Sequence, residues 1–68
     1  MRLSITYITE VLKDGQWKPV HEAKDMDDMF MAMCKVKLDD KQAKIRARIV
    51  NVWLDRSTME VHVEETIA

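Results

Sequence analysis

Three basic residues at alternate positions are the part of the sequence best suited to binding chemistry. Lys44, Arg46 and Arg48 occur at i, i+2 and i+4, so on a strand their side chains would project from one face and span about 13 Å. That span matches about two or three phosphate steps of a nucleic-acid backbone. With a tryptophan or tyrosine nearby for base stacking, this basic row could bind single-stranded nucleic acid. It could equally meet the surface of another protein.

The charge of the whole chain argues against a general affinity for nucleic acid. Six of the 11 lysines and arginines lie between Lys35 and Arg48, yet the net charge at pH 7 is −1. Glu60 and Glu64 occur at alternate positions of the next expected strand, where they would form cross-strand ion pairs with the basic row. The pattern therefore favours a protein contact or a solvated, ion-paired face over nucleic-acid binding.

Residues that could carry catalysis are scarce. The chain has two histidines, His21 and His62, one cysteine, Cys34, and one glycine. It contains no Gly-rich phosphate loop, nucleophile elbow or His-Glu-x-x-His motif, and the acidic neighbours of the histidines define no third or fourth metal ligand. Cys34 has no second cysteine to pair with, and we expect it to be buried as a small apolar residue. The sequence thus predicts a protein that is not an enzyme and needs no metal or cofactor.

A length of 68 residues permits one domain, residues 1–68, with a small core. A chain of this size buries only about 60% of its unfolded surface, so a partner or a second copy would stabilise it. The longest apolar stretch, from Met29 to Cys34, is far too short to span a membrane, and the first residues lack the pattern of a signal peptide. We expect a compact cytoplasmic protein that makes no contact with a membrane.

Two alternating stretches joined by a tight turn predict a first β-hairpin. Residues 2–12 alternate between apolar and polar side chains, as does a strand with one buried face. Asp14 and Gly15 follow, and Asp-Gly is a strong signal for a short hairpin turn. Residues 17–23 then return as the second strand.

The second strand carries a proline that limits where it can lie. Pro19 cannot donate a ladder hydrogen bond, which places the strand at a sheet edge or at a bulge. A two-residue loop would pair Leu12 with Trp17, and a three-residue loop would pair Lys13 with Trp17. The two registers expose opposite faces of the strand, and the sequence does not distinguish them.

A helix is predicted to begin after Asp25 and to end near Leu38. Asp25 is suited to cap the helix, and Asp28, three residues later, suits its first turn. Apolar residues then recur at helical spacing and should face the sheet. They are Met26, Met29, Phe30, Met33 and Cys34.

The last part of the chain predicts a second hairpin, with strands over 43–54 and 59–64. We expect a three-residue loop over 55–57, because it pairs Trp53 with Met59 and keeps the apolar faces of both strands together. An even-length loop would mismatch those faces. Trp53 then points inward, and we expect it to pack in the core.

Apolar side chains continue the outward face beyond the basic row. Those on the two longest strands are Ile8, Leu12, Val50, Val52 and Leu54. Apolar residues rimmed by arginine and glutamate, on a face without a helix, are typical of an interface. Self-association and capture of another protein both fit this pattern.

The predicted order is β-β-α-β-β, an α+β fold in which one helix packs on an antiparallel sheet of about four strands. With Asp14-Gly15 in the first hairpin and Asp25 opening the helix, this architecture and length resemble the small proteins that bacteriophages and mobile elements encode. The resemblance to anti-CRISPR proteins, antitoxin-like inhibitors and other anti-defence factors extends over the whole chain. It implies a stoichiometric inhibitor and assigns no particular binding residue.

We therefore expect a small non-enzymatic protein that inhibits or regulates a larger host protein or nucleoprotein complex. The residues expected to bind this partner are Trp17, Lys44, Arg46, Arg48, Val50 and Val52. A nucleic-acid-binding regulator that uses the basic row is the alternative. A homodimer that buries the outward face is a third hypothesis.

Overall fold

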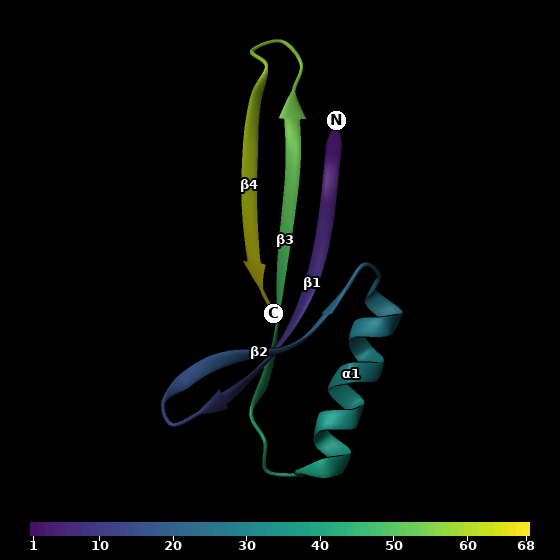
Figure 1. Ribbon diagram of the computed structural model, residues 1–68, viewed down its shortest axis with the longest axis vertical. Coiled ribbons are helices and arrows are strands. Elements are labelled where there is room, and N and C mark those ends of the chain that lie inside the picture. The colour runs from purple at the N-terminus through teal and green to yellow at the C-terminus, as the bar shows by residue number, and fades with distance from the viewer.

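A computed structural model describes all 68 residues and contains one helix and one antiparallel sheet. The elements are β1 (Arg2–Lys13), β2 (Gln16–Ala23), α1 (Met26–Asp39), β3 (Ile45–Asp55) and β4 (Glu60–Ile67). The strand order in the sheet is β2-β1-β3-β4, and α1 lies against one face of it (Figure 1). The predicted α+β class and the β-β-α-β-β order are confirmed.

The turn between β1 and β2 is the shorter of the two alternatives. Asp14 and Gly15 both adopt positive φ, 53° and 77°, as the central residues of a type I′ turn do. Lys13 consequently pairs with Gln16, and Leu12 with Trp17. This register places Trp17 on the face of the sheet away from α1.

Pro19 has both of the consequences expected of it. The strand that contains it, β2, lies at the edge of the sheet. Pro19 pairs with Glu10 while His21 pairs with Thr9, so Val20 is an additional residue on the β2 side. This bulge bends the hairpin, and in Figure 1 the end of β1 and β2 curls away from the other strands.

The start of α1 is capped as the sequence predicts. The carboxylate of Asp25 accepts a hydrogen bond from the Asp28 N–H at 2.8 Å, which satisfies one of the free donors of the first turn. At the other end, Lys37 Nζ donates to the Ala43 carbonyl at 2.5 Å, tying the helix to the segment that leads into β3.

The contact face of α1 is rotated from the predicted one. Met29 is buried and packs with Ala23 and Ala47, and Met33 lies against this cluster. Three residues of the predicted apolar face are exposed, namely Met26, Phe30 and Cys34. The expectation that Cys34 is buried is therefore wrong. Because α1 rests mainly on β1 and β2 near one edge of the sheet, only a narrow row of its side chains contacts the strands.

The second hairpin does not have the predicted loop. Asp55 pairs with Glu60, so the loop has four residues, 56–59, and the three-residue loop is wrong. The Asp55 carboxylate accepts hydrogen bonds from the Ser57 N–H at 3.0 Å and the Ser57 hydroxyl at 2.7 Å. This side-chain turn starts the reversal at Asp55, and Met59, at φ 58°, completes it in the left-handed region.

The longer loop reverses the faces of β4. Val61 pairs with Leu54 and Val63 with Val52, so both valines join the face of the sheet that α1 leaves open. We call this the outer face, and the other the helix face. Trp53 keeps its predicted inward side, but it stacks on His62, with ring centroids 4.6 Å apart, and does not join the buried cluster around Met29.

The chain is more extended than the compact domain that its length predicts. Its principal extents are 47 × 26 × 14 Å, and its accessible surface of 5179 Å² exceeds the about 4,450 Å² expected for a compact chain of this mass. Figure 1 shows the reason: β3, β4 and the start of β1 extend beyond the N-terminal end of α1. That half of the sheet has no covering layer on either face.

Candidate interaction surface on the outer face

The register brings all six residues expected to bind a partner to the outer face. Leu12 pairs with Trp17 and donates its N–H to the Lys44 carbonyl at 3.0 Å, so Trp17 and Lys44 flank the same end of β1. Arg46 lies next, opposite Glu10. The remaining three follow at alternate positions of β3, namely Arg48, Val50 and Val52.

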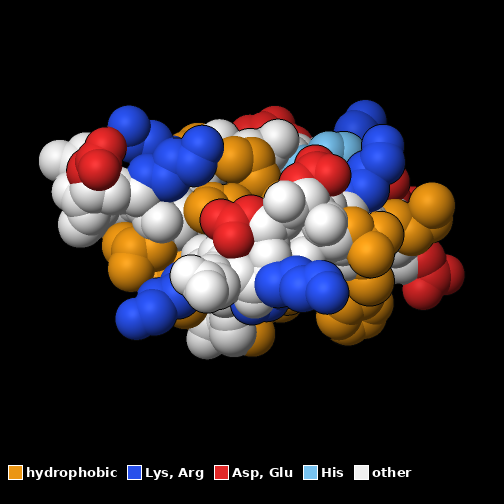
Figure 2. Space-filling model, turned by 90° about the horizontal axis from the view of Figure 1, so that it is seen from below, with side chains coloured by type: hydrophobic (Ala, Val, Ile, Leu, Met, Phe, Trp, Pro, Cys, Tyr) orange, Lys and Arg blue, Asp and Glu red, His pale blue; other side chains and the backbone are white.

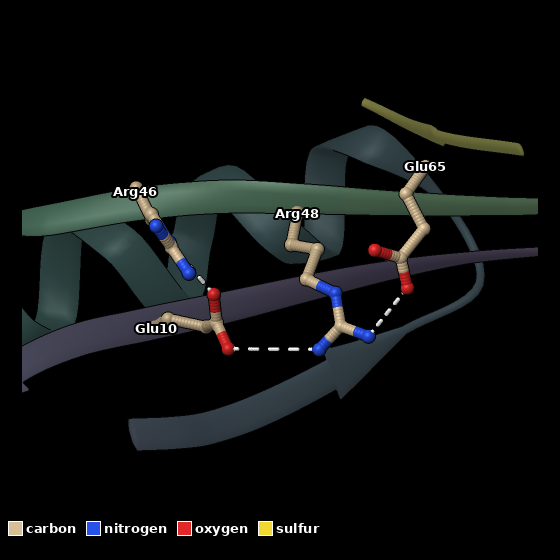
Figure 3. Close-up of polar contacts among 4 residues, drawn as sticks. All are labelled: Glu10, Arg46, Arg48 and Glu65. Atoms are coloured by element: carbon tan, nitrogen blue, oxygen red, sulfur yellow. Dashed lines mark hydrogen bonds and ion pairs between the residues drawn. The ribbon is translucent and has the colours of Figure 1, made fainter. Parts of the chain in front are cut away.

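A buried carboxylate connects the two arginines of the row. Glu10 is only 3% exposed, and its Oε1 accepts a hydrogen bond from Arg46 Nε at 2.8 Å. Its other oxygen lies 3.8 Å from Arg48 Nη1, and Arg48 Nη2 donates to Glu65 Oε1 at 2.6 Å. Figure 3 shows the four side chains linking β1, β3 and β4. We call this group, Glu10, Arg46, Arg48 and Glu65, the outer network.

The carboxylates of the outer network are not those that the sequence indicated. Glu64 pairs with Asn51 on the helix face, and Glu60 lies opposite Asp55, so the expected pairing of Glu60 and Glu64 with the basic row is wrong. The reversed faces of β4 are the cause, since they bring Glu65 to the outer face instead. Glu10 was missed because its partner lies 36 residues away, and only the β1–β3 register reveals it.

The electrostatic setting of Arg48 favours its charged form. Its hydrogen bond to Glu65, and then the negative charge of Glu65, raise the pKa of Arg48 above its ordinary value. Arg48 is therefore a permanent cation whose charge is already engaged within the molecule. Of the basic row, only Lys44 makes no ion pair.

Trp17 is held in place by the same group. The guanidinium carbon of Arg46 lies 4.5 Å from the centre of the Trp17 ring, a cation–π geometry. Arg46 thus lies between a buried carboxylate and an aromatic face. The side chain of Trp17 is half-buried, so an indole of restricted mobility borders the outer network.

Apolar side chains continue the outer face on β3 and β4 beyond the outer network. We call this area the apolar strip; its residues are Val50, Val52 and Leu54 of β3 with Val61 and Val63 of β4. Val61 and Val63 are 59% and 62% exposed. Both were expected to face inward, because a three-residue loop would have turned them toward the helix.

Charged side chains elsewhere are mixed in sign. Figure 2 shows the end of the molecule formed by the first hairpin and the C-terminal end of α1. Lysine and arginine side chains alternate there with acidic and apolar ones. No continuous basic area covers that end. This mixture gives little reason for a polyanion to bind there.

Each histidine lies near one acidic side chain. His21 Nε2 is 3.4 Å from Asp28 Oδ2, and His62 Nε2 is 3.7 Å from Glu60 Oε2. No group of three or more histidine, cysteine, aspartate or glutamate side chains is placed to hold a metal ion. The single helix has neither the length nor the apolar composition to cross a membrane.

Comparisons of the chain with protein-family models, with curated proteins and with solved structures found no match. The chemistry of the outer face is therefore the basis on which a function can be proposed.

Proposed function

We propose that this protein is a small binding protein that inhibits or regulates a larger protein or nucleoprotein complex by occupying a surface on it. The observation that carries the proposal is the outer face. There an uncovered apolar strip adjoins an ordered group of arginines, glutamates and a tryptophan. The action would be stoichiometric, as in the anti-defence proteins that bacteriophages encode.

The composition of the outer face supports this proposal. Protein interfaces combine an apolar centre with aromatic and arginine side chains, and tryptophan and arginine often contribute most of the binding energy. Trp17 and Arg46 hold each other in place, so ordering them on binding would require little loss of conformational entropy.

The alternative, a nucleic-acid-binding regulator, has less support. Two of the three cations in the basic row, Arg46 and Arg48, are paired with carboxylates of the same molecule. The guanidinium of Arg46 also covers one face of the Trp17 ring, which limits base stacking on that face. A phosphate at Arg48 would have to compete with Glu10 and Glu65 for the guanidinium.

Recovery of partners from a bacterial lysate on the tagged protein tests the class of partner. A protein recovered in near-equal amount, retained after nuclease treatment and at moderate salt, supports the proposal. Recovery of nucleic acid, with protein partners lost after nuclease and binding that falls steeply with salt, contradicts it and favours the alternative.

A pair of variants tests the surface. Val52→Asp places a charge in the apolar strip, and Met31→Asp places the same charge on α1, at a side chain that is 69% exposed. We expect Val52→Asp to lose the partner and Met31→Asp to keep it, with circular dichroism confirming that both variants fold. Loss in Met31→Asp alone would contradict the assignment of the outer face.

A further inference from the structure

The two edges of the sheet are built differently. The β2 edge carries Pro19 and a bulge at Val20, features that prevent a further strand from pairing. The β4 edge has eight residues, Glu60–Ile67, in regular register with β3, and it contains no proline, glycine, lysine or arginine. A strand of this kind is a template for another strand.

The hydrogen-bond pattern of β3 and β4 identifies the groups that face the open edge. Ala47 and Ala68 exchange both backbone hydrogen bonds, at 3.1 and 2.9 Å. Bonded pairs recur at every second residue of an antiparallel ladder, so the even-numbered residues of β4 are bonded to β3. The backbone N–H and C=O groups of Val61, Val63 and Glu65 therefore point away from the sheet.

We propose that β4 pairs antiparallel with β4 of a second copy of this chain, about a two-fold axis at Val63. The two sheets then form one continuous sheet of eight strands. Val63 exchanges both of its free backbone bonds with its counterpart, and Val61 does so with Glu65 of the second copy, giving about six main-chain hydrogen bonds in all.

Avoidance of like charges selects this register from the neighbouring ones. An axis at Val63 places His62 beside Glu64 of the second copy, twice, and brings no two carboxylates directly opposite each other. An axis at His62 would set Glu60 against Glu64, and an axis at Glu64 or at Glu65 would set two copies of one glutamate against each other. An axis at Val61 would end the overlap at Val63 and leave Glu65 unpaired. The Val63 register is the longest one without like-charge opposition.

Exposed apolar side chains lie along the β4 edge, where the second copy would contact them. Val61, Val63 and Ile67 are 59%, 62% and 57% exposed, and the axis brings the two copies of Val63 into contact. The apolar strips of both copies then meet in one surface. The contact uses the edge and leaves the outer face free, so it is distinct from a homodimer that buries that face.

Amide hydrogen exchange measured by NMR over a range of concentrations tests this pairing. We expect the amides of Val61, Val63 and Glu65 to be protected at high concentration and to lose protection on dilution, while Glu64, bonded within the sheet, stays protected throughout. Light scattering should give twice the 8.0 kDa of the single chain under the protecting conditions. Rapid exchange of the three edge amides at every concentration would overturn the proposal.

A matched pair of variants tests the edge itself. Val63→Pro removes a donor from the open edge without removing any bond to β3, and Val63→Thr keeps that donor. We expect the proline variant to be monomeric and the threonine variant to dimerise. Should Val63→Pro unfold, Val63→Glu provides the same test, because it sets two carboxylates against one another at the axis and should also give a monomer. A dimer that persists in whichever of these variants folds would overturn the proposal.

Discussion

At the scale of single residues, Glu10 determines how the outer face is organised. It is a buried acid, and burial of a carboxylate is unfavourable unless hydrogen bonds and opposite charges compensate for it. Arg46 and Arg48 supply both. The basic row is thus in part a structural feature, which is why its charge alone is a poor guide to a phosphate ligand.

Substitution of Glu10 tests this role. We expect Glu10→Ala to lower the free energy of unfolding by about 2–3 kcal/mol, because it removes a hydrogen bond to the charged Arg46 and the carboxylate that faces Arg48 at a buried position. The matched control is Glu65→Ala, which removes an exposed partner of Arg48 and should lower it by less than about 1 kcal/mol. Urea unfolding measures both. Equal effects of the two substitutions would contradict the buried role of Glu10.

A second prediction at the scale of single residues concerns the buried hydroxyl of Thr9. It is fully buried on the helix face, and its hydroxyl has no hydrogen-bond partner. Thr9→Val replaces that hydroxyl by a methyl group of similar shape, so we expect the free energy of unfolding to rise by about 1 kcal/mol. Thr6→Val, at a partly exposed position of the same strand, should change it little. A destabilised Thr9→Val protein would show that the hydroxyl does have a partner.

At the scale of elements, local turn and capping signals were better guides to the fold than the matching of apolar faces. Although its register was left open, the first hairpin was predictable because Asp14-Gly15 itself adopts the backbone of a tight turn, and the cap at Asp25 is equally local. The loop after β3 was not, because side-chain hydrogen bonds at Asp55 outweighed the matching of apolar faces. The rotation of α1 depends on which strands it meets, and no local pattern encodes that.

The turn at Asp55 makes a prediction about pH. The hydrogen bonds from the Ser57 hydroxyl and then from its N–H lower the pKa of Asp55 below the ordinary value of 3.8. The bonded turn therefore stabilises the hairpin above that value, and the stabilisation is lost as the pH falls through the lower pKa of the folded protein. NMR titration of the Asp55 carboxyl should show this pKa, and Ser57→Ala should raise it toward 3.8. An unchanged pKa in Ser57→Ala would contradict the turn.

At the scale of the whole molecule, the protein is a long sheet with a helix on one half. Its radius of gyration, 14.3 Å, exceeds the about 11 Å expected for a compact chain of this length. The α+β class followed from the order of alternating and helical patterns. The exposed hairpin did not, because it follows from the register of β4 and from the position of α1, whose N-terminal end lies short of that half of the sheet (Figure 1). Both features leave apolar surface available to other molecules.

Photo-crosslinking from defined positions in bacterial cells tests the central claim, that the outer face binds a partner protein. A benzophenone amino acid at Val50, in the apolar strip, is compared with one at Leu38, which is 80% exposed on α1. We predict a discrete adduct larger than a dimer of this chain from Val50 and none from Leu38. Adducts from Leu38 with none from Val50, or adducts with nucleic acid alone, would contradict the account.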